Sequence, residues 1–343
     1  MRSLLPFFVL SSATVFAVTD TGQPEENETE ESKFDMRQRL FGSLEFLYWT
    51  VQEGALDYAI HMNHPAPAAA AFATGDYKIA DFDWSPGFRA VLGFYRAPHY
   101  WEVFGQYTWF YSKGSNRAFA PSEAGEFLSA TWGEMTTPPL QSAESHISLH
   151  YHIGDLLVTR VFDPNPHLRM RWVGGITTAF IEQSWRIDYY NFSLGHDHIK
   201  NKWKFAGGGL RIGITVDWFW TGSIYLSGKA SVATLVGAYH NHAKQTTNAA
   251  GFDPKIPVRN VIYNSPRFAF QSQILIGPSY QKSYCWPREW DLEVFVGYEF
   301  NAWFNLQEVY RSTQSLPGFP KETNLETGVL GFHGLSLRAT IGF

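Results

Sequence analysis

The feature that most constrains this fold is an alternation of apolar and polar residues that recurs in ten segments of the chain. The last segment, LSLRATIGF, sets Leu335, Leu337, Ala339, Ile341 and Phe343 against Ser336, Arg338, Thr340 and Gly342. Because successive side chains leave a β-strand on opposite faces, each segment predicts a strand with one apolar face. The segments lie at about 42–53, 75–95, 100–113, 144–161, 167–188, 200–218, 221–241, 264–282, 289–308 and 327–343.

The connectors between these segments alternate between short and long. Short ones lie near 98 and at 162–166, 219–220 and 283–288, whereas long ones cover 54–74, 114–143, 189–199, 242–263 and 309–326. This asymmetry is typical of a transmembrane antiparallel up-and-down β-barrel with short periplasmic turns and long extracellular loops. We expect about 10–12 strands, because LDYAIHM with DYKIADF, or VRNVIY, would add a hairpin.

The faces of individual strands follow from the same alternation. LRIGITVDW places Ile212, Ile214 and Val216 toward lipid, and DLEVFVGYEFNAWF does the same for Val294 and Val296. In HISLHYHIG we assign Ile147, Leu149, Tyr151 and Ile153 to the lipid side and Ser148, His150 and His152 to the lumen. Asp155 breaks that pattern, and we expect a β-bulge to re-aim it.

Aromatic residues are unusually frequent at 17%, with 28 Phe, 17 Tyr and 13 Trp. A soluble sandwich also alternates, but its packed core seldom needs so many Trp and Tyr. In a barrel they predict two interfacial girdles. One lies by the short turns, with Tyr100, Trp101, Trp218, Trp220, Trp286, Trp290 and Phe343. The other lies near the long loops, with Trp109, Trp185, Tyr189, Trp203, Tyr239 and Trp303.

Three regions are predicted along the chain. Residues 1–17 have the charge, apolar core and small-residue cleavage site of a signal peptide, 18–41 form a flexible acidic segment, and 42–343 form the barrel. The net charge of −5 and the lack of a basic block argue against nucleic-acid binding. The single cysteine, Cys285, forms no intramolecular disulfide, and we expect it to be buried and inert rather than linked to another chain.

Three stretches carry a resemblance to a known family. GSLEFLYWTVQEGALDYAI (42–60), FDWSPGFRAVLGF (82–94) and the terminal LSLRATIGF resemble the major outer membrane protein family of Legionella and chlamydia-like bacteria. The resemblance implies a porin-like, abundant surface barrel in the bacterial outer membrane. Chlamydial relatives are cysteine-rich and cross-linked, from which the single Cys285 departs. Similarity to outer-membrane proteins in general implies that Phe343 is read by the barrel-assembly machinery.

The charged residues of the predicted inner face are the candidate pore-lining residues. Placing Arg or Lys on the lipid side would cost about 2–4 kcal/mol at the midplane, which favours the inward register. Seven basic and six acidic side chains follow from it: Glu45, Arg89, Glu102, Arg169, Arg171, Arg211, Asp217, Lys229, Arg267, Asp291, Glu293, Glu299 and Arg338. They fit either a transverse field across a water-filled constriction or a salt-bridged network that fills a narrow barrel.

No catalytic residue, metal site or cofactor is predicted. His196-Asp197-His198 and His240-x-His242 have spacings that offer metal ligands, but we interpret them as polar loop residues. A phospholipase pair of Ser148 and His150 would need to lie on the outer rim, which our register does not allow.

We therefore predict a non-enzymatic channel for passive diffusion of small hydrophilic solutes, in contact with outer-membrane lipid. The alternative is a structural or adhesive surface protein whose barrel anchors the long loops. The sequence leaves open whether the protein forms a homo-oligomer.

Overall fold

The computed structural model describes residues 39–63, 75–96, 101–123, 125–132, 139–192, 195–248, 256–285, 290–312 and 323–343. All of its regular elements are β-strands, as predicted. They are β1 (Arg39–Glu53), β2 (Asp57–Met62), β3 (Gly75–Ile79), β4 (Ser85–Arg96), β5 (Trp101–Phe119), β6 (Phe127–Ala130), β7 (Leu140–Asn165), β8 (Leu168–Asn191), β9 (His196–Phe219), β10 (Ile224–Asn248), β11 (Ile256–Tyr284), β12 (Trp290–Ser312) and β13 (Thr323–Gly342).

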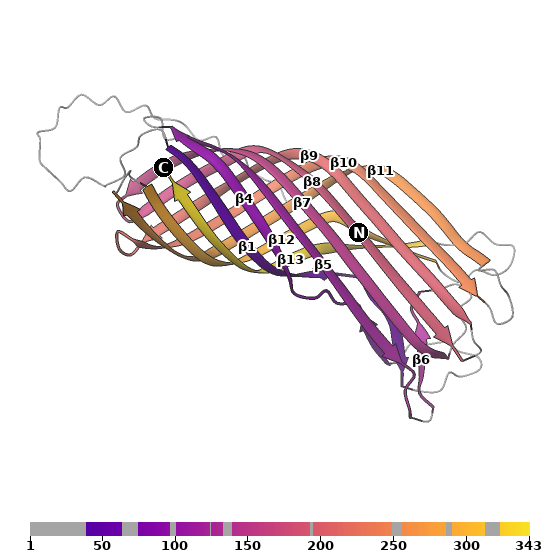
Figure 1. The fold of residues 1–343 in the computed structure, drawn as a ribbon. Helices are drawn as coiled ribbons and strands as arrows, with labels where there is room; N and C mark the ends of the chain where they lie inside the picture. Colours follow the sequence, from indigo (N-terminus) through magenta and orange to yellow (C-terminus); the bar gives the residue numbers. More distant parts are fainter. Residues whose placement is uncertain are drawn as a thin grey trace, which may run out of the picture. The chain divides into compact units, whose positions relative to one another are not determined.

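Ten of the strands close into an antiparallel ring in the order β1-β4-β5-β7-β8-β9-β10-β11-β12-β13, which confirms the predicted barrel (Figure 1). The seam joins the first and last strands, with Glu45 opposite Arg338. At the short-turn end, Leu40 and Phe343 exchange backbone N–H···O bonds of 3.0 and 2.9 Å. Phe343 is exposed on the outer side of this rim, and its part in assembly stays a prediction.

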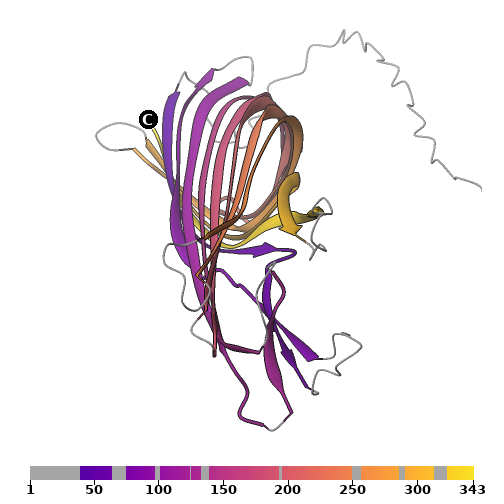
Figure 2. The ribbon, with the colours of Figure 1, turned by 90° about the vertical axis from the view of Figure 1, so that its right-hand side faces the viewer.

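Three short strands lie outside the ring at its long-loop end. β2 pairs with β3 and with β6, and β6 pairs with β7, so these strands extend the barrel wall at one edge (Figure 2). The hairpin expected from LDYAIHM and DYKIADF is therefore present. VRNVIY adds no further strand, because it lies inside β11.

The half of the barrel near the short turns has an apolar outer surface. The lipid belt is defined by its exposed outward residues: Leu44, Phe46, Phe88, Leu92, Tyr107, Leu156, Val158, Trp172, Ile176, Phe180, Leu210, Ile212, Val232, Val236, Phe268, Phe270, Ile274, Ile276, Val294, Val296, Phe300, Leu335, Leu337 and Ile341. The inward neighbours of these residues are mostly polar, as in other transmembrane barrels. The predicted faces of β9, β12 and β13 are confirmed.

The half near the long loops has the opposite polarity. Along β8, Trp185, Ile187 and Tyr189 point inward and are buried, while Ser184 and Arg186 lie on the outside. The strands here are much longer than the roughly 9–11 residues that cross a bilayer: β11 has 29. The predicted long loops are therefore too long, because β5 continues to Phe119 and β7 already starts at Leu140. Alternation in this half builds a core above the membrane.

The predicted register of β7 is wrong for this reason. Ile147, Leu149, Tyr151 and Ile153 are buried inside the barrel, whereas Ser148, His150 and His152 face outward. Asp155 shares the inward face, and the pairing of β7 with β8 is continuous from Ser142 to Phe162, so no bulge re-aims it. Apolar side chains face lipid only at membrane height.

The aromatic girdle predicted near the long loops is also corrected. Trp185, Tyr189, Trp203, Tyr239 and Trp303 are buried in the barrel interior. Only Trp109 of that group faces outward, where it stacks on Phe88. The girdle predicted by the short turns agrees with the structure at four positions, because Trp101, Trp218, Trp220 and Phe343 are exposed there. Trp290 is partly exposed, while Tyr100 and Trp286 lie outside the described residues.

Two further expectations concern the chain ends and the cysteine. Residues 1–38 lie outside the described residues, so the signal peptide and acidic segment stay predictions. Cys285 is exposed next to β11, which contradicts the expectation that it is buried. Among the described residues there is no helix long and apolar enough to cross a membrane.

Candidate functional site in the barrel lumen

All thirteen charged residues predicted for the inner face do point into the barrel. They do not form one group. Most lie at membrane height, where two layers of polar contacts follow one another along the lumen. Arg267 lies higher, in the long-loop half, where it contacts Glu308 and lies 3.6 Å from the ring centre of Tyr239. Whether these residues line a conducting pore stays a prediction.

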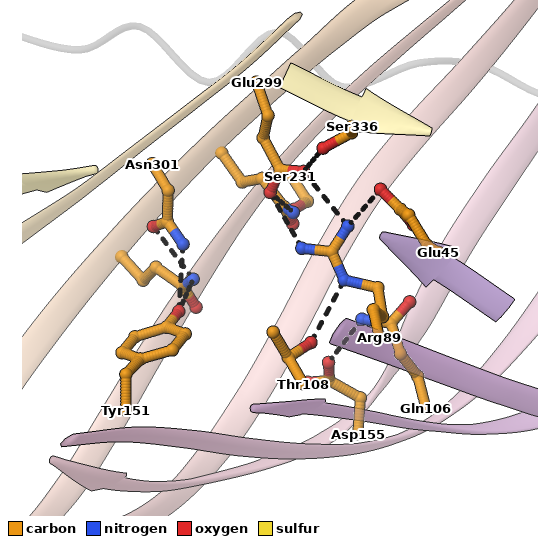
Figure 3. A network of polar contacts seen from close by, with 12 residues as sticks. Glu45, Arg89, Gln106, Thr108, Tyr151, Asp155, Ser231, Glu299, Asn301 and Ser336 are labelled. Atoms are coloured by element: carbon orange, nitrogen blue, oxygen red, sulfur yellow. Dashed lines mark hydrogen bonds and ion pairs between the residues drawn. The ribbon is translucent and has the colours of Figure 1, made fainter. Parts of the chain in front are cut away.

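Arg89 of β4 is the centre of the upper polar layer. Its two terminal nitrogens donate to both carboxylate oxygens of Glu299 at 2.9 and 3.0 Å. One of them also donates to Glu45 at 3.0 Å, and Nε donates to Thr108 at 3.0 Å. A bidentate arginine–carboxylate pair is both strong and directional. Arg89 thus joins β4 and β5 to β1 and to β12 across the lumen (Figure 3).

Arg211 of β9 forms the second centre of this layer. Its Nε lies 3.1 Å from Asp155 Oδ1, and its terminal nitrogens donate to Gln271 at 2.6 Å and Gln273 at 2.9 Å. Gln273 in turn donates to Glu299, which also accepts a 3.2 Å bond from Ser336. The two arginines therefore belong to one hydrogen-bonded set.

We call this set the Arg89 network. Its members are Glu45, Arg89, Gln106, Thr108, Tyr151, Asp155, Arg211, Ser231, Gln271, Gln273, Glu299, Asn301 and Ser336, and they come from every ring strand except β8. Each member is at most 8% exposed. A layer of buried, mutually hydrogen-bonded side chains from nearly all ring strands therefore crosses the lumen at this height.

A second polar layer lies toward the short turns. Arg171 contacts Asp217, which accepts a 2.6 Å bond from Ser227. Across the lumen Arg338 donates to Glu293 at 2.9 Å. Three more predicted residues lie at this end. Glu102 accepts from Thr159 at 3.0 Å, Arg169 contacts Asp163 at 2.9 Å, and Asp291 is the second residue of β12. Lys229 projects inward from β10 between Ser227 and Ser231.

Sequence reasoning missed the uncharged and misassigned members of the Arg89 network. Asp155 was expected to need a β-bulge, whereas it lies inward without one because it shares the buried face of Tyr151. Gln106, Gln271, Gln273 and Asn301 carry no charge, so the charge pattern gave no signal for them. Their positions on the predicted inner faces were the only available sign.

The histidines considered as metal ligands lie in strands β9 and β10 rather than in loops, contrary to the prediction. His196 and His198 both bond to Asp188 Oδ1, at 3.0 and 2.7 Å, while Asp197 points to the inside of the wall. Burial raises the pKa of Asp188, but the hydrogen bonds from the two histidines outweigh this effect. The pKa of Asp188 therefore lies below its ordinary value. In the described part of the chain no group of three or more His, Cys, Asp or Glu is placed to hold a metal ion. Ser148 and His150 are both outward, contrary to the prediction.

The comparison with protein families decides the identity of this barrel. Residues 30–340 match the family described as Legionella pneumophila major outer membrane protein precursor. The chain belongs to this family. The resemblance seen in the sequence is thereby confirmed, and so is the outer-membrane location. In this Legionella major outer membrane protein family member we expect the short turns on the periplasmic side and the long-loop half on the extracellular side, as is general for bacterial outer-membrane barrels.

Solved structures of outer-membrane proteins are more distantly similar to this family member. The Escherichia coli outer membrane protease OmpT is 11% identical with a TM-score of 0.43, over 89% of this chain and 96% of that chain. The Pseudomonas putida toluene transporter TodX is 8% identical with a TM-score of 0.28, over 91% of this chain and 90% of that chain. No curated protein sequence matches the chain.

Proposed function

We propose that this barrel acts as a closed membrane anchor, which holds its extracellular half at the cell surface. The observation that carries the proposal is the Arg89 network, whose central Arg89–Glu299 pair is buried, with side chains 4% and 1% exposed. Ten strands are only slightly more than the eight that side chains can fill, and far fewer than the 16–18 of water-filled porins. The proposal assigns no catalytic step to the chain.

The extracellular half supports the same proposal. Its interior is a packed aromatic core in which Trp132 meets Trp185 edge to face at 4.8 Å, and Trp203 stacks on Tyr239. A rigid body of this kind, on strands that continue from the membrane, suits a surface that contacts other molecules. Outer-membrane lipid and the barrel-assembly machinery are the partners it requires, and neither a homo-oligomer nor a solute is needed.

The second candidate function is passive diffusion of small hydrophilic solutes. One observation favours it: the inner face at membrane height carries many charges, whereas a purely structural barrel needs none. Conduction through this lumen would require the Arg89 network to rearrange. Removing one partner of a buried ion pair costs about 3–5 kcal/mol, so such a rearrangement would have to preserve the pairing.

Single-channel recording in planar bilayers tests the two candidates. We expect the parent protein to give no stepwise conductance, and the double variant Arg89→Ser/Glu299→Ser to give small steps, because it shortens both members of the central pair. Glu45 loses the hydrogen bond from Arg89 in this variant. The matched control Glu293→Ser/Arg338→Ser removes an ion pair of the periplasmic layer and should stay closed. Steady conductance of the parent would instead favour the channel.

A further inference from the structure

Three cations lie side by side on the outer wall of the extracellular half. Arg186 of β8 is directly opposite Lys200 of β9, and Lys200 is directly opposite Lys244 of β10. All three are exposed. Like charges in directly opposite positions destabilise a sheet, so this arrangement is not explained by the stability of the barrel alone.

More basic residues surround this row. We define the cation patch as Arg186, Lys200, Lys202, Lys204, His240, His242 and Lys244, all outward on β8–β10. Two outward carboxylates accompany them. Glu182 contacts both Lys202 and Lys204, and Asp188 contacts Arg186 at 3.3 Å as well as two histidines. Within the described residues Lys200 and Lys244 have no ion-pair partner, so the patch keeps a positive charge.

The patch lies immediately above the lipid belt. Glu182 is the next outward residue after Phe180 on β8. On β9 the outward neighbour of Ala206 toward the long loops is Lys204, and on β10 the outward neighbour of Ala238 in that direction is His240. Just below the lysines the outer surface is formed by small residues, Ala206, Gly208 and Ala238, between the larger Phe180 and Phe268. An acyl chain can therefore approach the backbone closely at this place, with its headgroup at the height of the lysines.

We propose that the cation patch binds the phosphate groups of a lipid of the outer leaflet, whose acyl chains lie on the belt below. Lysine ammonium groups attract phosphate as point charges, and cations at a membrane surface recognise anionic headgroups. The apolar strip beneath the patch distinguishes a lipid from a free anion or an acidic protein, which would gain nothing from it. The inference does not depend on whether the lumen conducts.

Native mass spectrometry of the protein in phosphatidylcholine nanodiscs tests this proposal. One set of discs contains a small share of lipid A with two phosphates, and the other contains lipid A with its phosphates removed. The parent protein should retain the phosphorylated lipid preferentially. The variant Lys200→Ala/Lys244→Ala should retain it about tenfold less, because each lysine near the surface contributes to the attraction.

The control variant is Lys113→Ala/Lys282→Ala, which removes two exposed lysines of β5 and β11 outside the patch and should retain the lipid as the parent does. Equal retention by the patch variant and the parent would overturn the proposal, as would equal retention of both lipids by the parent. Saturable binding of inorganic phosphate to the parent in discs without lipid A, lost in the patch variant, would assign a free-anion site and also overturn it.

Discussion

At the scale of single residues, the extracellular half contains one buried carboxyl group that no cation neutralises in the described structure. Glu53, at the end of β1, accepts a 2.9 Å bond from the amide of Gln183. Burial raises the pKa of Glu53 from 4.5 to about 8, although the bond from Gln183 lowers it somewhat. Glu53 is therefore protonated in the folded protein at neutral pH, whereas an unfolded chain would release that proton.

This shift predicts a pH dependence of stability. A carboxyl group whose pKa is raised by folding stabilises less as pH rises from 4.5 to 8, because the unfolded state loses its proton first. Glu53→Gln keeps the shape of the side chain but removes the titrating carboxyl group. The stability of the variant should therefore not decline over this pH range. The measurement is the temperature at which the folded gel band converts to the unfolded band, over that pH range.

Glu182→Gln serves as the control for this prediction. Burial raises the pKa of Glu182, but the hydrogen bonds from Lys202 and Lys204 lower it to below its ordinary value. Glu182 is therefore ionised in the folded state and, over most of the range, also in the unfolded state, so its replacement should leave the slope there unchanged. If the parent and Glu53→Gln showed the same slope, the carboxyl group of Glu53 would not be protonated in the fold.

At the scale of elements, β8 shows how one face of one strand changes its surroundings along its length. Its outward residues Trp172, Ile176 and Phe180 belong to the lipid belt, and the outward residues that follow are Glu182, Ser184 and Arg186. The alternation continues without a bulge between Met170 and Tyr190, since the pairing with β9 is unbroken there. Only the medium outside the wall differs.

A pair of substitutions on this strand tests the position of that change. Ile176→Arg places a cation in the belt and should cost about 2–4 kcal/mol or block insertion, as a charge near the midplane does. Ser184→Arg, on the same face but above the belt, should insert normally. Heat-modifiable gel migration of membrane-inserted protein measures both. Normal insertion of both variants would place the belt elsewhere on β8.

The sequence predicted the ring of strands and the faces of β9, β12 and β13 because the alternating parts of those strands lie at membrane height. The predicted faces of β7, and of the aromatic residues Trp185 and Trp203, were wrong because alternation does not reveal whether the apolar face of a strand lies inside or outside the barrel. It also did not predict partners across the lumen. Arg89 and Glu299 are separated by 210 positions, and their meeting depends on strand tilt and register around the whole ring.

At the scale of the whole molecule, the single cysteine reports the orientation in the membrane. Cys285 is exposed at the periplasmic end, directly after β11. Lys244, in contrast, is exposed on the extracellular half of β10. A maleimide reagent that does not cross the outer membrane should therefore leave the parent unlabelled in intact cells and label it after permeabilisation.

The variant Cys285→Ser/Lys244→Cys reverses this expectation, since its thiol should react in intact cells. Both proteins are compared in the same cells by the mass added to the purified chain. Labelling of Cys285 in intact cells would contradict the periplasmic assignment of the short turns.

The abrupt step in polarity above Phe180 also fixes how deeply the barrel is immersed. Sinking by one pair of residues would bring Glu182 and Lys204 into hydrocarbon, and rising by the same amount would expose Phe180 to water. Because both displacements carry a cost, we expect the bilayer to change its thickness to match the barrel, and the barrel to keep its depth. This protein should therefore set the local thickness of the bilayer around it.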